Sequence, residues 1–320
     1  MTAAAIILAA GKSTRMKSEL PKVLHEVCGK PMLAHVLEAC REAGVERLVV
    51  VVGHRKDDVI AAFAGQDDIE WVEQVEQKGT GHAALMCAPV LDGFAGPVLT
   101  IAGDMPLIRG ATVADVLAES ARTRHAVTLA TSMLDEPAGY GRIVRDASGA
   151  LAAIVEHNDC TPEQRAIREV NISYYCFAGE RLFDLLRRIE PNNAKGEYYI
   201  TDAVAIALAE GWGAGAIPTV PAEDAMGINS RADLALVSRV MQERIQSYWL
   251  EHSVSIVDRS TTWIEAGAAL GPETTIYPFT YVGTGAEVGG GCRLGPHASV
   301  ARGERVSPGA VVNALVGTGA

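Results

Sequence analysis

Several common site signatures are missing from this sequence. Its six cysteines are scattered, without a C-x-x-C pair or a cluster of cysteine and histidine. Structural zinc and a disulfide scaffold are therefore not expected, and the pattern predicts a protein of the reducing cytoplasm. No apolar run approaches the roughly 20 residues that span a bilayer, so no membrane insertion is expected.

The sequence also has fewer basic residues than acidic ones. The chain of 320 residues holds 28 lysines and arginines against 39 acidic residues, which gives a net charge of −11. Such a chain repels nucleic acid and anionic membranes, so neither is an expected partner. A polyphosphate site would have to oppose this overall field, and a divalent cation becomes an expected cofactor.

The first two thirds of the chain alternate apolar runs with amphipathic stretches. Strands are expected at residues 5–9, 47–52, 97–102, 126–132 and 171–177. Helices are expected at residues 31–43, 55–64, 79–88, 110–122, 180–189 and 199–210. Strands interleaved with helices predict an α/β domain with a mostly parallel sheet, whose ligands bind beyond the carboxyl ends of the strands.

The hydrophobic period changes after residue 252. Residues 231–252 predict one long amphipathic helix, which contains neither proline nor glycine and would act as a connector. An aliphatic residue then recurs at every sixth position from Ile264 to Val312, in nine consecutive matches. This period predicts a hexapeptide parallel β-helix. With about 18 residues per coil, the array holds between two and three coils.

A small-residue, basic loop follows the first expected strand, in the segment I-I-L-A-A-G-K-S-T-R-M. Ala9, Ala10 and Gly11 keep side chains away, so backbone N–H groups can approach an anion. Arg15 and Lys22 bring positive charge to the same place. The loop matches neither the Walker motif nor G-x-G-x-x-G. The loop alone favours phosphate binding and an ordinary loop with solvated lysines about equally.

Two further motifs carry candidate site residues. G-D-M-P-L puts Asp104 where an acid can ligate Mg²⁺ held by phosphates, although a cap on the turn before Pro106 is the alternative. Q-V-E-Q-K-G-T-G-H-A could let a flat ring approach Gly79 and Thr80, with Gln74 reading its edge. Alternatively, Thr80 caps the helix that follows. These residues alone leave both alternatives open.

Weaker motifs lie further along the chain. G-Y-G-R-I, V-E-H and V-N-I-S place Gly141, Glu156 and Asn171 at strand ends or turns. Gly141 offers backbone donors, while Glu156 and Asn171 can pair with sugar hydroxyls or an amide. Each of these residue types is more often structural than functional. G-E-Y-Y-I-T-D starts a helix, and G-I-N-S-R puts Asn229 just before the connector.

Taken in order, these motifs resemble one family over residues 5 to about 250. It is the bifunctional bacterial N-acetylglucosamine-1-phosphate uridyltransferase / glucosamine-1-phosphate acetyltransferase family, and the hexapeptide array extends the resemblance. The first loop is shared by all sugar-nucleotide pyrophosphorylases, whereas G-T-G-H-A, V-E-H and G-E-Y-Y-I-T-D together are narrower. The resemblance implies a Rossmann-like nucleotidyltransferase domain (1–230), a connector helix (231–252) and a short left-handed β-helix (253–320).

The resemblance also implies site roles. The nucleotide would be held by Leu8, Ala9, Ala10, Gly11, Arg15 and Lys22, and its uracil recognised by Gln74, Gly79 and Thr80. The sugar would be held by Gly103, Gly141, Glu156, Asn171 and Asn229. Mg²⁺ would be bound by Asp104 and Asn229, and catalysis would depend on Arg15, Lys22 and Asp104.

The implied reaction is Mg²⁺-dependent uridylyl transfer from UTP to N-acetyl-α-D-glucosamine 1-phosphate. It yields pyrophosphate and UDP-N-acetylglucosamine, a cell-wall precursor. The attacking phosphate is already ionised, so catalysis is positioning and charge stabilisation. The alternatives are another hexose 1-phosphate, dTTP in place of UTP, or a non-catalytic nucleotide-sugar-binding relative. A non-catalytic relative would be expected to have lost Arg15, Lys22, Asp104 or Asn229, and all four are present.

Three positions depart from the family pattern. Ser13 stands where the family usually has glycine, and Ala102 where related enzymes can carry a tyrosine. Asn171 is followed by Ile172 and Ser173 instead of Thr-Gly. These departures put the shape of the loop and of the sugar pocket in question.

Left-handed hexapeptide β-helices commonly pack as trimers, so a homotrimer through the β-helix is expected. The family's acetyl-CoA site needs a long β-helix assembled between neighbouring chains, and this array stops within three coils. No acetyltransferase activity is therefore expected. We predict that the purified 320-residue chain transfers no acetyl group from acetyl-CoA to glucosamine 1-phosphate. Release of CoA above that of a heat-denatured control would contradict this.

Overall fold

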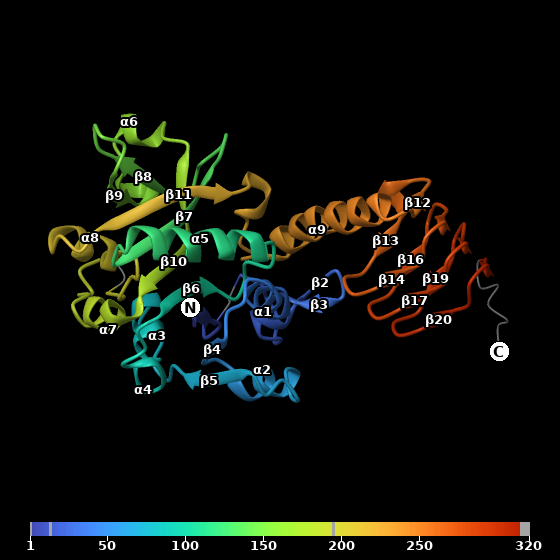
Figure 1. Ribbon diagram of the computed structural model, residues 1–320, viewed down its shortest axis with the longest axis horizontal. Coiled ribbons are helices and arrows are strands. Elements are labelled where there is room, and N and C mark those ends of the chain that lie inside the picture. The colour runs from blue at the N-terminus through green and yellow to red at the C-terminus, as the bar shows by residue number, and fades with distance from the viewer. Residues whose placement is uncertain (1, 13–14, 194–195, 314–320) are drawn as a thin grey trace. The chain divides into compact units, whose positions relative to one another are not determined.

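The computed structural model describes residues 2–12, 15–193 and 196–313, and they form two compact units (Figure 1). The first unit comprises residues 1–24 and 32–229, and the second comprises residues 25–31 and 230–320. The short segment 25–31 thus groups with the second unit, whereas the sequence-based boundaries assign it to the first domain. The division into a nucleotidyltransferase domain, a connector helix and a β-helix at residues 230 and 252 stays a prediction.

Within the described residues, a nine-stranded sheet forms the centre of the first unit. Its order is β11-β7-β10-β6-β1-β4-β5, with β8 and β9 added beside β10. Most strands run in one direction, and β9 and β10 run against their neighbours. The strands are β1 (Ala4–Leu8), β4 (Arg47–Val52), β5 (Ile69–Glu73), β6 (Pro97–Ala102), β7 (Val127–Met133), β8 (Gly141–Arg145), β9 (Leu151–Val155), β10 (Glu169–Ala178) and β11 (Ala214–Val220).

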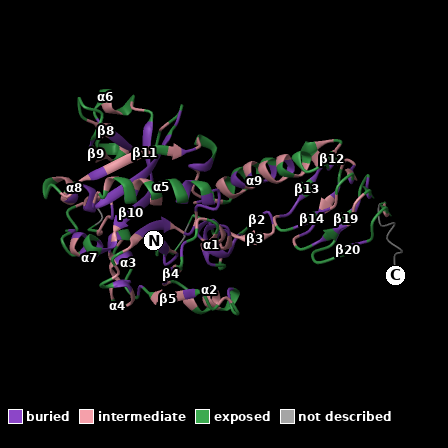
Figure 2. Cartoon of the chain, in the orientation of Figure 1, coloured by how far each residue is buried: buried purple, intermediate pink, exposed green. Residues whose placement is uncertain are grey.

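Helices cover both faces of this sheet. They are α1 (Met32–Glu42), α2 (Lys56–Ala62), α3 (Thr80–Leu85), α4 (Ala88–Leu91), α5 (Gly110–Thr123), α6 (Pro162–Arg165), α7 (Gly179–Arg187) and α8 (Asp202–Ala209). In β1, Ala5 and Ile7 pack into one core with α1 and α5, while Ala4 and Ile6 pack into the other with α3 and α7. Figure 2 shows the central strands buried along their length. A strand covered on both faces is apolar at every position, which is why β1 does not alternate.

The predicted α/β class with a mostly parallel sheet is confirmed, but the prediction missed the edge strands. β5 and β11 end the sheet on its two sides, and most of their residues are only half-buried. β11 also contains glycine and Pro218, which a central strand would not tolerate. Half-buried strands of this kind lack the continuous apolar run that marks β1, β4 and β6.

The carboxyl ends of β1, β5 and β6 lie along the same edge of the sheet. Leu8 pairs in register with Ala102 on one side and with Val51 on the other. Backbone hydrogen bonds continue this alignment into the loops, from the Gly103 N–H to the Leu8 carbonyl (2.9 Å) and from the Gln74 N–H to the Val52 carbonyl (2.8 Å). The loops that follow these strands therefore open at one common edge.

The second unit is built from short parallel strands in three ladders. Their orders are β12-β15-β18-β21, β13-β16-β19 and β14-β17-β20. The strands are β12 (Ser255–Ile256), β13 (Trp263–Ile264), β14 (Ala269–Leu270), β15 (Thr275–Ile276), β16 (Tyr281–Val282), β17 (Glu287–Val288), β18 (Arg293–Leu294), β19 (Ser299–Val300), β20 (Arg305–Val306) and β21 (Val311–Val312). The six-residue aliphatics stack inside, as in Ile264, Val282 and Val300, each 0% exposed. This arrangement confirms the hexapeptide β-helix.

Helix α9 (Arg231–Glu251) packs against the first coil of the same unit. Ser230 and Asp233 form a capping box at its start: the Asp233 N–H donates to Ser230 Oγ (3.2 Å), and the Ser230 N–H donates to Asp233 Oδ2 (2.8 Å). Ile245 and Trp249 of the helix contact the interior cluster of the coils. The hairpin of β2 (Glu26–Val27) and β3 (Lys30–Pro31) belongs to this unit as well.

Two composition-based expectations can be compared with the structure. In the part of the chain that the structure describes, no helix is long and apolar enough to cross a membrane. The six cysteines are all buried and free of disulfide bonds.

A buried carboxylate links three successive coils of the second unit. The side chain of Glu265 is 7% exposed and receives hydrogen bonds from Arg302 (2.8 Å) and from the Thr284 N–H (2.9 Å). Burial alone would raise the pKa of Glu265, but these hydrogen bonds outweigh it and lower the pKa to about 2.

The Glu265 interactions predict an acid-sensitive stability. A carboxyl whose folded-state pKa lies below its unfolded value contributes stability above the unfolded pKa, and that contribution disappears as the pH falls toward the folded pKa. The contribution of Glu265 is on the order of 3 kcal/mol above pH about 4.5. We expect Glu265→Gln to lower the thermal unfolding temperature at pH 7. The gap to the wild type should narrow steadily between pH 5 and 3, and a gap independent of pH would contradict this account.

Candidate functional site

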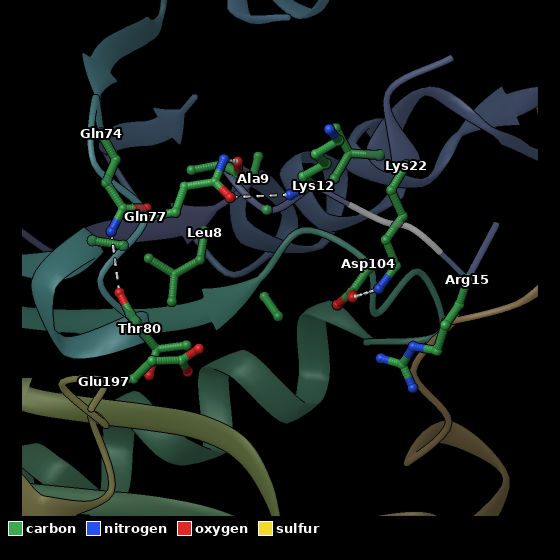
Figure 3. A pocket seen from close by; sticks show the side chains of 16 residues that line it. Leu8, Ala9, Lys12, Arg15, Lys22, Gln74, Gln77, Thr80, Asp104 and Glu197 are labelled. Atoms are coloured by element: carbon green, nitrogen blue, oxygen red, sulfur yellow. Dashed lines mark hydrogen bonds and ion pairs between the residues drawn. The ribbon is translucent and has the colours of Figure 1, made fainter. Parts of the chain in front are cut away.

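A cavity of about 440 Å³ opens in the first unit where the loops after β1, β5 and β6 meet (Figure 3). Ten residues predicted from the sequence line it: Leu8, Ala9, Ala10, Gly11, Arg15, Lys22, Gln74, Gly79, Thr80 and Asp104. The structure adds Lys12, Val23, Gln77, Ala83, Ala102 and Glu197 to this lining. Ser13 lies outside the described residues.

An ammonium group links two distant segments at one end of this cavity. Nζ of Lys22 contacts Oδ2 of Asp104 and lies 3.0 Å from Oδ1 of Asn229. Arg15 donates from Nη2 to the same oxygen of Asn229 at 2.8 Å. The side chains of Lys22 and Asp104 are 13% and 23% exposed. The four residues whose loss would indicate a non-catalytic relative therefore meet in one cluster.

Local packing explains the position of Lys22. Pro21 precedes a short 3₁₀ helix, Lys22–Leu24, and its carbonyl accepts a hydrogen bond from the Leu24 N–H (2.9 Å). Val23 and Leu24 are buried, so the turn is anchored while Lys22 faces the cavity. A Cβ on Gly103 would come within 3.4 Å of Val23 and 3.3 Å of the Leu8 carbonyl, which leaves little room for any other residue there.

The G-T-G-H-A segment is shaped by a glycine-only backbone. Gly79 has φ 108° and ψ 176°, a conformation essentially restricted to glycine. The G-E-Y-Y-I-T-D segment packs directly on it, with the Tyr198 carbonyl accepting from the Gly81 N–H at 2.8 Å. Oγ1 of Thr80 accepts from the Ile200 N–H (3.1 Å), and no side chain caps the first turn of α3. The interpretation of Thr80 as a helix cap is therefore wrong.

Two glutamines hold the loops around the cavity. Gln74 donates from Nε2 to the Gly79 carbonyl (3.1 Å), and the same nitrogen lies 2.9 Å from Nδ1 of His82. Gln77 donates to the Ala10 carbonyl (2.6 Å), and its Oε1 accepts from the Lys12 N–H (3.4 Å). Gln77 lies within the Q-V-E-Q-K-G-T-G-H-A motif, but the motif does not single it out, because its role depends on the loop folding back over Ala10.

Three of the five predicted sugar-binding residues form a separate cluster, whereas Asn229 lies with Lys22 and Gly103 lies beside Leu8. A Cβ on Gly141 would lie 3.6 Å from Oε1 of Glu156 and 3.7 Å from Cβ of Asn171, so the three residues converge. They are not among the residues that line the 440 Å³ cavity. Burial raises the pKa of Glu156, and the nearby charges of Asp159 and Asp202 raise it further.

Hydrogen bonds within β10 orient the amide of Asn171. Its Nδ2 donates to the hydroxyl of Tyr175 (2.8 Å), and its Oδ1 accepts from the Ser173 N–H (3.1 Å). The strand is irregular here, and Ser173 adopts a positive φ of 64°. The family pattern has glycine at this position, which matches the left-handed backbone. Ser173 keeps the same turn at some conformational cost.

Comparison with known proteins places this architecture in a family. The model of the MobA-like NTP transferase domain matches residues 5–195. The chain belongs to this family of NTP transferases. The matched region includes the small-residue loop after β1, the G-T-G-H-A segment and the cluster of Gly141, Glu156 and Asn171.

Relatives of this NTP transferase extend the match through the coils. "Bifunctional protein GlmU" of Geobacter metallireducens is 45% identical over 291 residues, which are 91% of this chain and 61% of that protein. The protein of the same name from Pelobacter propionicus is 43% identical over 291 residues (91% and 63%), and that from Halalkalibacterium halodurans is 41% identical over 293 residues (92% and 64%). The resemblance to the bifunctional family is confirmed, and the chain spans about three fifths of the length of these relatives.

The backbone of Gly79 can be tested with a matched pair of substitutions. In Gly79→Ala the new Cβ would lie 2.6 Å from the Tyr198 carbonyl, so the loop and its neighbour must separate. Gly139 also has a positive φ, 85°, but a Cβ added there would meet nothing within 4 Å. We expect Gly139→Ala to cost about 1 kcal/mol and Gly79→Ala about 3 kcal/mol, measured by denaturant unfolding. Equal costs would mean that the Tyr198 contact does not constrain the loop.

Proposed function

We propose that this chain transfers a uridylyl group from UTP to N-acetyl-α-D-glucosamine 1-phosphate, giving UDP-N-acetylglucosamine and pyrophosphate. One observation carries the proposal: Arg15, Lys22, Asp104 and Asn229 cluster beside a small-residue loop at the carboxyl edge of a mostly parallel sheet. Membership of the NTP transferase family supports nucleotidyl transfer. The sugar 1-phosphate is the finer part of the proposal and rests on the motif resemblance.

Asp104 and Asn229 fit a divalent cation. One oxygen of each side chain reaches the same ammonium of Lys22, so the two donors converge on a point that favours positive charge. Among the described residues, no group of three or more His, Cys, Asp or Glu side chains could hold a metal. Mg²⁺ typically uses one or two protein oxygens and completes its shell with phosphates and water. We propose that Asp104 and Asn229 hold Mg²⁺, which would supply charge neutralisation at the phosphates.

The chemistry then needs little covalent participation from the protein. A phosphate oxygen of the sugar phosphate forms a bond to the α-phosphorus of UTP, and the bond from that phosphorus to the pyrophosphate oxygen breaks. Arg15 and Lys22 stabilise the charge on the departing pyrophosphate. Leu8 to Gly11 line the cavity and would hold the nucleotide through backbone groups. Gly141, Glu156 and Asn171 would hold the N-acetylated sugar.

Assembly and location complete the proposal. We propose a homotrimer through the left-handed hexapeptide coils, and a cytoplasmic location. The six free cysteines support the proposed location, because a reducing compartment keeps thiols from forming disulfides.

The reaction and its metal can be tested together by measuring pyrophosphate release. We expect release with UTP and N-acetylglucosamine 1-phosphate in the presence of Mg²⁺, and loss of release when EDTA is added. We expect Asp104→Ala to reduce turnover by at least about 100-fold without loss of fold, because a charge-stabilising group is removed.

Asp67→Ala is the matched control, since Asp67 is exposed. Comparable turnover in Asp104→Ala and the wild type would contradict the metal role. A clear preference for glucose 1-phosphate, or for dTTP, would contradict the proposed substrates.

A further inference from the structure

The amide of Gln74 has one chemically possible orientation in the first unit. The residue is 4% exposed, and one amide atom lies 3.1 Å from the Gly79 carbonyl oxygen. A carbonyl oxygen only accepts hydrogen bonds, so the atom that faces it must be the NH₂ group. The neighbouring backbone therefore settles which end of the amide is nitrogen.

The same NH₂ group fixes the state of His82. It lies 2.9 Å from Nδ1 of the ring and can only donate, so Nδ1 must accept. The ring proton then sits on Nε2 and the imidazole is neutral. A protonated ring would present a second donor to the amide and break this contact.

The surroundings of His82 favour the neutral ring. Burial lowers the pKa of His82 and the charge of Lys78 lowers it further, while Glu76 opposes them. Glu76 and Lys78 come from the loop before α3 and pair with each other. Arg187 of α7 and Tyr198 line the same small hollow as the imidazole. The guanidinium of Arg187 pairs with Asp92, so burial is the main cause that favours the neutral ring.

Because Nε2 of Gln74 already contacts the Gly79 carbonyl and His82, the amide oxygen Oε1 remains as an acceptor for a ligand. Among the residues that the structure describes, none donates to its Oε1, and Gln74 lines the 440 Å³ cavity. Uracil and thymine carry a hydrogen on N3 and can donate to such an oxygen. Cytosine has an unprotonated N3, which would face the oxygen with a second lone pair.

We propose that His82 is a positioning residue for base recognition, holding the Gln74 amide so that Oε1 accepts from the N3–H of a uracil-type base. The proposal deepens the uridylyl transfer proposed above and rests on it. The arrangement selects against cytosine and does not distinguish UTP from dTTP. The Oε1 acceptor of Gln74 therefore selects, on this side of the cavity, a base that donates a hydrogen bond from N3.

Two substitutions of nearly equal shape separate the hydrogen bond from packing. His82→Asn places an oxygen where Nδ1 lies, whereas His82→Leu places a methyl group there. We expect the Leu variant to raise KM for UTP about tenfold, to leave kcat within about twofold, and to reduce the preference for UTP over CTP by a similar factor. The Asn variant should keep the KM for UTP and the preference for UTP over CTP close to the wild-type values.

The pH profile gives a readout that a packing role would not move. As the pH falls through the pKa of His82, the wild type should lose UTP affinity because Nδ1 becomes a donor. The Asn variant has no titrating ring and should lack this component in the same buffers. Nitrogen NMR of the wild-type protein should also show an unprotonated Nδ1 at pH 8, and an Nδ1–H tautomer would overturn the proposal even where a variant fails to fold.

The outcomes separate this inference from the proposed reaction. If the Leu variant keeps wild-type KM and base preference while the wild type makes UDP-N-acetylglucosamine, the inference is wrong and the reaction stands. If no sugar phosphate supports turnover, the proposed reaction is rejected, and calorimetric binding of UTP and CTP replaces KM as the test of the inference. Selective loss of UTP binding in the Leu variant then supports the inference. Equal binding of UTP and CTP by the wild type overturns it.

Discussion

The contact of Lys22 with Asp104 and Asn229 is the constraint on which the candidate site depends. Its members lie 82 and 207 residues apart in sequence, and only the sheet brings them together. The pairing of β1 with β6 aligns Gly103 beside Leu8, which sets Asp104 at the edge where the small-residue loop after β1 begins. The ammonium of Lys22 donates to two oxygen acceptors at this point, so a cationic centre is built into the fold before any substrate binds.

This cationic centre is local in a chain of strongly acidic character. The net charge of −11 works against polyphosphate binding, whereas Lys12, Arg15 and Lys22 bring positive charge to the cavity. A catalyst of phosphoryl-type transfer gains mainly from such preorganised charge, because the nucleophile arrives already ionised. Side-chain amides hold the neighbouring loops in place: Gln74 donates to the Gly79 carbonyl, and Gln77 donates to the Ala10 carbonyl.

Periodicity predicted the elements that are uniformly buried and missed those that are not. The non-alternating apolar runs of β1, β4 and β6 and the six-residue aliphatic period each follow from burial, so the sequence carries them plainly. The edge strands β5 and β11 and the orientation of Gln74 depend on neighbours that only folding supplies. The predicted sugar-binding residues Gly141, Glu156 and Asn171 converge outside the lining of the cavity, and no sequence spacing could indicate this separation.

A crystal structure with UDP-N-acetylglucosamine and Mg²⁺ would test the central claim most directly. We expect Mg²⁺ bound by Asp104 and Asn229 at the position that the ammonium of Lys22 now occupies, with Lys22 turned to a phosphate. Mg²⁺ bound away from both side chains, with Lys22 still between Asp104 and Asn229, would contradict this assignment.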